Sequence, residues 1–238
     1  MRLILLLALA SAAYGQIKLS KDLKLQKVAE DAWVVRHDWT FASNSVVLRM
    51  PGGEVVMIDT PCTSKATARL VEWIRDELKP SVLTAVNTHY HVDRLGGNGA
   101  LRRLDIVSWG TTHTARLVKE RGKLEATAPQ DPLIPPEQLF DENQPIKLHG
   151  LEIFYPGAGH TPDNIVVWDP VRRILAGGCL IVGWPKLGYM READPSAWLE
   201  ALDKLDRLAP AIVVPGHGDR TDPELIESTR VLLRNYRR

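Results

Sequence analysis

The stretch Asn87-Thr88-His89-Tyr90-His91-Val92-Asp93-Arg94-Leu95-Gly96-Gly97 directly follows the apolar run Val82-Leu83-Thr84-Ala85-Val86. The apolar run predicts a buried strand, and the polar residues begin where that strand ends. In extended backbone His89 and His91 point to the same side, and Asp93 follows within reach of a second ion. Neutral imidazole and carboxylate groups are common zinc ligands. The stretch therefore predicts a metal-binding loop, the alternative being a surface loop with two incidental histidines.

Three further candidate ligands, His160, Cys179 and His217, each follow a glycine at the end of another apolar run. Loops at neighbouring strand ends can converge on one rim of a scaffold. The six candidates divide into one set of His89, His91 and His160 and another of Asp93, Cys179 and His217. Three protein ligands per ion leave a position open for water, as in catalytic zinc sites. Taken singly, Cys179 could be a small buried hydrophobic residue and either histidine a core residue, but together the six favour a metal centre.

The N-terminal residues read as a signal peptide. Met1-Arg2 precedes an apolar segment, residues 3–13, and Ala13-Tyr14-Gly15 supplies small residues for cleavage before Gln16. The segment is too short to span a bilayer, and the alternative is a hydrophobic N-terminal strand. We therefore expect residues 1–15 to be removed and the protein to be periplasmic or secreted. The remaining residues, 16–238, are expected to form one domain, since the chain is 45% hydrophobic and 25% charged.

Charge and cysteine content restrict the possible partners. Without Arg2 the chain carries 29 basic and 29 acidic side chains, and this balance argues against nucleic acid or a membrane surface as a partner. An exported protein with two cysteines could form one disulfide, but Cys179 is better used as a ligand and Cys62 is expected to be a packed free thiol. His37, His113 and His149 lack a comparable setting and are expected to be structural or surface residues.

Hydrophobic periodicity and turn signals predict the remaining elements. Strands are expected at residues 25–28, 33–36, 45–49, 54–58, 82–86, 105–108, 146–148, 151–155, 165–168, 173–176 and 211–214. Helices are expected to follow Thr63 or Ser64 as far as Leu78, and over 98–103, 112–121 and 194–208, with a last one that begins at Asp222-Pro223. Residues 123–138 are expected to be an irregular connection. This order predicts an α/β fold with sheets packed against each other and covered by helices.

The motif His89-x-His91-x-Asp93-Arg94, together with His160, Cys179 and Pro215-Gly216-His217-Gly218, resembles the metallo-β-lactamase superfamily. Within it, the pattern is similar to the di-zinc, cysteine-containing subclass of class B β-lactamases. Arg94 and Cys179 stand where thioesterases of the superfamily carry a histidine and a bridging aspartate. His89 stands where the mono-zinc subclass has an asparagine. The resemblance covers essentially all of residues 16–238.

The resemblance implies a four-layer αββα sandwich that holds two Zn²⁺ ions per chain. It also implies opening of the β-lactam ring of penicillins, cephalosporins and carbapenems by attack of a zinc-bound hydroxide, which Asp93 would orient. Asp59 is expected to accept a hydrogen bond from a ligand histidine, or else to be a polar strand terminus.

Two positions depart from the subclass. Val182 stands where a lysine usually binds the substrate carboxylate, and Tyr189 falls where an asparagine is common. Lys186 could supply the missing cation, unless it is only a solvated loop residue. Trp39 and Phe41 are the aromatic residues available to cover a substrate, and Trp184 could line the opposite wall.

Three functions are consistent with these residues. The first is a secreted zinc β-lactamase that acts as a monomer on a small-molecule β-lactam. The second is a lactonase or thioesterase of the same superfamily, which the absent lysine favours and Cys179 and Arg94 oppose. The third is a non-catalytic zinc-binding or structural protein, which three ligands per ion oppose.

Overall fold

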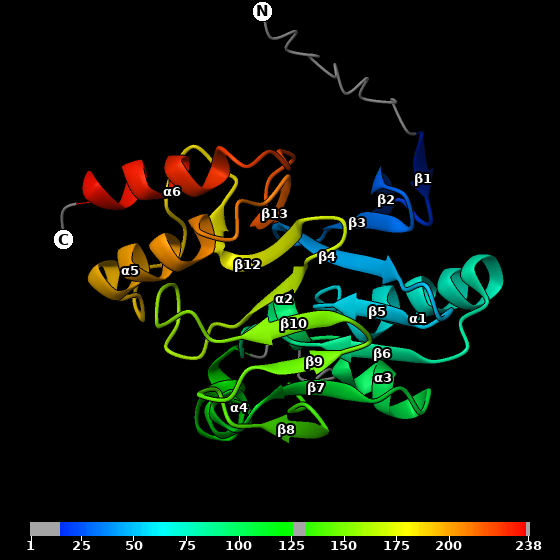
Figure 1. Cartoon of the computed structure of the whole chain (residues 1–238). Helices are drawn as coiled ribbons and strands as arrows, with labels where there is room; N and C mark the ends of the chain where they lie inside the picture. Colours follow the sequence, from blue (N-terminus) through cyan, green and yellow to red (C-terminus); the bar gives the residue numbers. More distant parts are fainter. Residues whose placement is uncertain (1–14, 126–131, 237–238) are drawn as a thin grey trace, which may run out of the picture.

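The computed structural model describes residues 15–125 and 132–236 (Figure 1). All of the predicted signal peptide except Gly15 lies outside the described residues, and so does part of the predicted irregular connection. None of the helices in the described ranges has the length and hydrophobicity needed to cross a bilayer.

Eight strands form the first sheet, in the order of the chain. They are β1 (Gln16–Lys18), β2 (Leu23–Ala29), β3 (Ala32–Asp38), β4 (Ala42–Arg49), β5 (Val55–Ile58), β6 (Leu83–Val86), β7 (Ser108–Thr111) and β8 (Gln138–Phe140). Pairing is antiparallel from β1 to β5 and parallel from β5 to β8. The parallel part places the carboxyl end of β6, where the histidine motif begins, at one edge of the sheet.

Five strands form the second sheet, in the order β13-β12-β11-β10-β9. They are β9 (Ile146–Leu148), β10 (Leu151–Phe154), β11 (Val166–Asp169), β12 (Ile174–Val182) and β13 (Ile212–His217). Strands β12 and β13 pair in parallel, and their register shifts twice between Ala176 and Val182. These shifts lie next to Cys179, which therefore stands on an irregular part of the strand.

The two sheets pack face to face between two layers of helices. In β4, Val46 and Leu48 join Ile153 and Val167 of the second sheet in one buried cluster, whereas Val47 faces the opposite way. This alternation follows from the two-residue period of a strand. The predicted αββα sandwich is confirmed.

The helices are α1 (Ser64–Trp73), continued by the π-helical turn η1 (Ile74–Leu78), α2 (Val92–Leu95), α3 (Asn98–Arg103), α4 (Thr112–Glu125), α5 (Pro195–Asp206) and α6 (Leu225–Arg234). Buried residues of α1 and α3, such as Leu70 and Leu101, cover the first sheet. Those of α5 and α6, such as Trp198 and Leu233, cover the second. In Figure 1, α5 and α6 accordingly lie to the left of the strands and α1 to the right. Thr63 caps α1 as predicted, since its side chain accepts from the Ala66 amide.

Several predicted boundaries were wrong. The strand expected at 105–108 begins at Ser108, because Asp105 adopts a left-handed conformation and Ile106 bonds back to Leu101. Helix α4 runs through Gly122 instead of ending there. Strands β1 and β8, of three residues each, were not predicted.

Two further boundaries depend on local hydrogen bonding. Strand β12 does not stop at Ala176 but continues past Cys179 to Val182. Helix α6 begins at Leu225 rather than at Asp222-Pro223. The reason is that the Asp222 carboxylate accepts from the Arg220 guanidinium and does not cap the helix.

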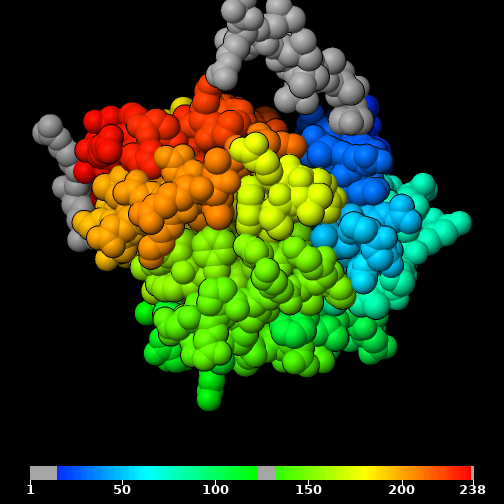
Figure 2. Space-filling model, in the orientation of Figure 1, coloured from blue at the N-terminus to red at the C-terminus, as the bar shows by residue number. Residues whose placement is uncertain are grey.

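The first and last segments of the described chain lie in the same part of the molecule. In the space-filling view the blue N-terminal strands and the orange and red C-terminal segments occupy the upper part, and the green middle of the chain forms the lower part (Figure 2). Asn44 of β4 joins these regions by donating to the Pro215 and Gly218 carbonyls, at 3.1 and 2.7 Å. The loop that carries His217 is therefore fixed against the first sheet.

Candidate metal centre

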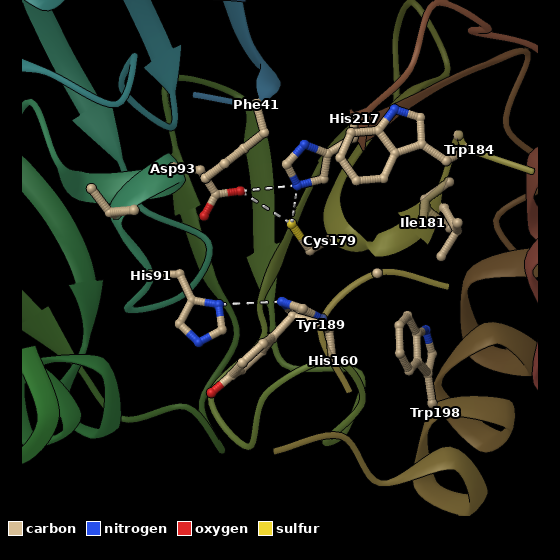
Figure 3. Close-up of a pocket in the computed structure, with 14 residues that line it drawn as sticks. Phe41, His91, Asp93, His160, Cys179, Ile181, Trp184, Tyr189, Trp198 and His217 are labelled. Atoms are coloured by element: carbon tan, nitrogen blue, oxygen red, sulfur yellow. Dashed lines mark hydrogen bonds and ion pairs between the residues drawn. The ribbon is translucent and has the colours of Figure 1, made fainter. Parts of the chain in front are cut away.

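The structure brings all six predicted ligands together at one edge of the two sheets. His89 and His91 follow β6, and Asp93 lies in the short helix α2. His160 lies in the loop between β10 and β11, Cys179 in the bulged part of β12, and His217 at the end of β13. The labelled side chains point toward one another across a shared cavity (Figure 3).

The three histidines of the first set surround one point. The ring centroids are 4.8 Å apart for His89 and His91, 5.2 Å for His89 and His160, and 5.1 Å for His91 and His160. The His160 Nε2 atom lies 3.2 Å from the His91 Nδ1 atom. All three rings are steeply inclined to one another. The compact groupings of ligand atoms place His89 with His91 and Asp93, and also with His160 and Cys179.

The second set is equally compact. The His217 Nε2 atom lies 3.1 Å from the Asp93 Oδ2 atom and 3.4 Å from the Cys179 Sγ atom. The Sγ atom lies 3.5 Å from the same carboxylate oxygen. On the other side of its ring, His217 Nδ1 is 2.7 Å from the Ala42 carbonyl. A ring proton on Nδ1 donates to that carbonyl, so the unprotonated Nε2 faces Asp93 and Cys179 and can bind a metal ion.

The site residues fit a bound metal. His89 is fully buried, and neither ring nitrogen has a hydrogen-bond partner among the described residues. A buried polar group without a partner is costly, and a metal ion would satisfy one of these nitrogens. Ligand atoms in three groupings of these residues also lie within 4.8 Å of one another. Asp93 belongs to one grouping with His89 and His91 and to another with Cys179 and His217, so its carboxylate lies between the two sets.

Two glycines allow this close approach. Gly178 adopts φ +51°, and a Cβ atom there would lie 2.6 Å from the Thr88 hydroxyl oxygen. At Gly216 a Cβ atom would lie 2.8 Å from the Cys179 Sγ atom. Larger residues would therefore displace Cys179 and His217, and this accounts for the glycine that precedes each of them.

Burial and neighbouring charges set the protonation of these groups. Burial lowers the pKa of His89 well below its usual value and that of His160 to about 3, with help from the nearby His91. Both rings are thus neutral and able to bind a metal at neutral pH. Burial alone would raise the pKa of Asp93, but Arg94 and His217 hold it well below the usual range. Burial raises the pKa of the Cys179 thiol, so metal binding there releases a proton.

Arg94 organises the carboxylates behind the metal centre. Its guanidinium is fully buried and donates to Asp93 Oδ2 at 2.6 Å and to Asp59 Oδ2 at 3.2 Å. It also donates to the Asn44 and Gly216 carbonyls, at 2.7 and 2.8 Å. Arg94 therefore links both sheets to Asp93. In the sequence Arg94 is recognisable only as a family marker, since no local pattern reveals its partners.

Asp59 does not take the partner predicted for it. Its carboxylate accepts from the Thr88 amide at 2.7 Å and from the Thr88 hydroxyl at 2.9 Å, in addition to Arg94. It thus fixes the backbone just before His89 rather than the ring of a histidine. Burial, opposed by Arg94, raises the pKa of Asp59 to about 6.

Five of the six ligands line a pocket of about 410 Å³, and the fully buried His89 lies beneath it. Trp184 stacks on the His217 ring at a centroid distance of 4.4 Å, and Phe41 meets its edge at 5.9 Å. Tyr189 meets His91 at 5.6 Å from the other side. Most of the wall is therefore aromatic or aliphatic.

Of the four predicted substrate contacts, Phe41 and Tyr189 line this pocket. Trp39 does not, and instead packs against the Phe41 ring at 6.1 Å. Lys186 is exposed and is also absent from the lining. The structure therefore gives no support to a substrate contact by Lys186, and Trp39 reaches the pocket lining only through its contact with Phe41.

Glu192 contacts the centre from outside and was not predicted. One carboxylate oxygen lies 3.3 Å from His91 Nε2 and accepts from the Tyr90 hydroxyl, while the other accepts from Arg121 of α4. The hydrogen bond with His91, then that from Tyr90 and the charges of His91 and Arg121, lower the pKa of Glu192 to about 2. An ionised carboxylate at Nε2 keeps the proton there and leaves Nδ1 facing His160. Glu192 thus orients His91.

Replacing Glu192 by glutamine should weaken zinc binding by about 10- to 100-fold, the usual effect of losing a carboxylate behind a ligand histidine. At saturating zinc, kcat/KM should change far less, because no substrate contact is lost. Competition with a chromogenic chelator measures the affinity. Glu120→Gln, an exposed change on α4, is the matched control, and equal affinities in both variants would contradict a positioning role for Glu192.

The remaining cysteine and histidines lie outside the centre. His37 is buried and accepts from the Cys62 amide at 3.1 Å. His113 and His149 lie 3.6 Å from Glu142 and Glu54, respectively. Both cysteines are free, and the expectation of a packed thiol at Cys62 is confirmed.

The Cys62 thiol should be unreactive in the folded protein. Burial raises its pKa to about 12, so on the order of one thiol in 10⁴ is ionised at pH 8. A Cys179→Ser variant should thus release no colour with a disulfide reagent until denaturant is added. Rapid labelling of the native variant would show that Cys62 is accessible and ionised.

Fold and site together define an αββα metalloprotein with two adjoining three-residue ligand sets. Residues 38–217 match the metallo-beta-lactamase superfamily, and the chain belongs to that superfamily. The resemblance found in the sequence is thereby confirmed.

The chain is also similar to individual members of this superfamily. The chain is 32% identical to the metallo-beta-lactamase type 2 of Bacteroides fragilis, over 98% of this chain and 94% of that protein. It is 36% identical to the metallo-beta-lactamase type 2 of Bacillus cereus, over 81% of this chain and 73% of that protein. Among solved structures, a metallo-beta-lactamase from Erythrobacter litoralis superposes with a TM-score of 0.82 at 26% identity, over 93% of this chain and 100% of the other.

Proposed function

We propose that this chain is a zinc-dependent hydrolase that opens the β-lactam ring of penicillins, cephalosporins and carbapenems. The observation that carries the proposal is the convergence of the six ligands, five of which line one pocket, with Asp93 in a compact grouping on either side. The similarity to metallo-beta-lactamases of type 2 supports β-lactams as the substrate class.

The ligand roles follow from the donor atoms. His89, His91 and His160 would hold one zinc ion, and Asp93, Cys179 and His217 a second. Bound zinc supplies Lewis acidity and lowers the pKa of water to about 7. No serine or cysteine nucleophile is then needed, which agrees with a Cys179 thiol that lies buried against Asp93 and His217.

The chain's own groups would orient the reactants. The Asp93 carboxylate is kept ionised by Arg94, so it can accept a hydrogen bond from the attacking water and fix its direction. Phe41, Trp184 and Tyr189 would hold the substrate above the floor and exclude bulk water. Asp59 would contribute indirectly by fixing Thr88 and Arg94.

We propose two zinc ions per chain. The six ligands divide into three per ion, which is the number that catalytic zinc sites use, whereas closed structural sites use four. We also propose that residues 1–15 direct export and are removed, which leaves residues 16–238 as the functional domain in the periplasm or outside the cell. We propose that the chain acts as a monomer.

The test is an assay of purified residues 16–238 with a carbapenem and a chromogenic cephalosporin, beside a lactone and a thioester. Ring opening of the β-lactams that a chelator abolishes and zinc restores is expected. Turnover of the lactone or thioester without turnover of the β-lactams would support the zinc site but identify the chain as a lactonase or thioesterase. That alternative is favoured by the absence of lysine and arginine from the pocket lining within the described residues.

A further inference from the structure

One ligand of the second set is less enclosed than the rest. The His217 side chain is 17% exposed, whereas the other five ligands are buried. The Ala42 carbonyl fixes the Nδ1 atom of His217 by a hydrogen bond of 2.7 Å, but one bond to one ring atom does not prevent the ring from tilting. The direction in which Nε2 points toward Asp93 and Cys179 therefore depends on what packs against the ring.

Trp184 packs against the face of this ring (Figure 3). The ring centroids of Trp184 and His217 are 4.4 Å apart, and the ring planes are inclined by only 25°. Phe41 meets the same imidazole at 64° and Tyr189 meets His91 at 81°, so both of these are edge contacts. A face contact covers more of the imidazole than an edge contact does, and it opposes tilting of the ring.

The backbone places Trp184 at this position. Val182, two residues earlier, pairs with His217 in the parallel ladder of β12 and β13. Gly183 passes so close that a Cβ atom there would lie 2.1 Å from the His217 carbonyl oxygen. Pro185 follows Trp184 in the chain, and a proline restricts the residue before it to extended backbone conformations. The indole is thus placed beside His217 by its neighbours in the chain.

We propose that Trp184 is a positioning residue for His217, which keeps the imidazole directed at the second metal ion and so determines how tightly that ion is retained. The face of an indole also attracts positive charge, which His217 would carry in part when an ion is bound at Nε2. The inference rests on the proposed function, because it concerns the second of the two zinc ions.

A cobalt titration of the metal-free protein tests this role. Among the six ligands only Cys179 supplies sulfur, so the charge-transfer absorption between thiolate and Co²⁺ reports the second set alone. Trp184→Leu should raise the Kd measured from this absorption by about 3- to 30-fold, the range expected for loss of an aromatic contact that is strengthened by charge. An increase of less than about threefold would overturn the proposal.

Two further variants distinguish the stacked ring from the general shape of the pocket. Trp184→Phe keeps an aromatic face and should keep the Kd within about threefold of that of the wild type. Tyr189→Leu removes the ring that meets His91, and it should leave the charge-transfer titration unchanged. A loss in either of these variants as large as the loss in Trp184→Leu would contradict stacking on His217 as the cause.

Tryptophan fluorescence provides a measurement that does not need the leucine variant. Filling of the second set should change the emission of Trp184, because its indole lies 4.4 Å from a ligand ring. The fluorescence change that accompanies the charge-transfer absorption should therefore be smaller in Trp184→Phe than in the wild type. An identical change in the two proteins would contradict the contact between Trp184 and the metal-binding histidine.

The outcomes separate the role of Trp184 from the proposed function. Absence of the charge-transfer absorption in wild-type protein with excess Co²⁺ would overturn the second metal site, and with it the proposed function. Wild-type affinity in Trp184→Leu would leave that function intact and reject only the role of Trp184. Because the titration measures metal binding without substrate, loss of a substrate contact by Trp184 cannot produce the expected result.

Discussion

Replacing Arg94 by methionine should lower the free energy of unfolding of the metal-free protein by about 3–5 kcal/mol, the usual cost of removing one member of a buried ion pair. The guanidinium is fully buried, and its loss leaves both Asp93 and Asp59 without a counter-charge. Methionine retains most of the volume, so the cost is mainly electrostatic. Denaturant unfolding in the presence of a chelator measures it.

The pH dependence distinguishes this cause from poor packing. Arg94 holds the pKa of Asp93 low in the folded protein, so its stabilisation is present above the unfolded pKa of about 3.9 and is lost as the pH falls below it. In Arg94→Met the buried carboxylates have raised pKa values, and the variant loses stability as the pH rises through them. The deficit should therefore be larger at pH 8 than at pH 5.

Arg220→Met provides the matched control, since Arg220 pairs with Asp222 at 2.7 Å on the surface. An exposed pair contributes about 0–1 kcal/mol, so this variant should unfold almost like the wild type. Equal losses in the two variants would show that the Arg94 network does not stabilise the fold.

Replacing His89 by leucine should have opposite effects with and without metal. Both buried ring nitrogens lack a hydrogen-bond partner among the described residues, and an unsatisfied buried polar group costs about 1–3 kcal/mol. The metal-free variant should therefore be as stable as the metal-free wild type, or more so. With zinc at about 1,000 times its Kd the wild type should gain about 4 kcal/mol, and the variant should gain much less.

Activity provides the second measurement for this variant. β-Lactam opening by His89→Leu should fall by at least about 10³-fold, in line with the several kcal/mol that metal catalysis supplies. Thermal unfolding with zinc and with a chelator measures the stability of the variant and the wild type in their metal-bound and metal-free forms. His113→Leu serves as control, because His113 lies in α4 beside Glu142, outside the centre. A His89 variant that is destabilised equally in both conditions would identify His89 as a structural histidine.

Local sequence signals were sufficient to predict the layers of the fold. The alternation of Val46, Val47 and Leu48 and the i+4 stripe that includes Leu70 predicted elements with one or two buried faces, and burial depends mainly on such periodicity. The wrong boundaries lie where a side chain or a special backbone conformation intervenes, as at Asp105 and Asp222.

The ligand positions could be predicted for a different reason. Glycine before Cys179 and before His217 marks a close backbone approach, and these residues do converge. Their partners could not be predicted, because contacts such as Arg94 to Gly216 or Tyr90 to Glu192 join residues about a hundred positions apart in the chain. For the same reason the sequence assigned Asp59 to a histidine instead of to Thr88.

Two adjoining ligand sets beneath one pocket are proposed to act together to open a β-lactam. The most direct test is a zinc titration of metal-free protein in which bound zinc and cephalosporin opening are followed in the same samples. The account predicts binding of two equivalents per chain and ring opening that is absent without zinc and rises as zinc binds. Ring opening that is undiminished in the metal-free protein, or tight binding of two equivalents without any ring opening, would contradict it.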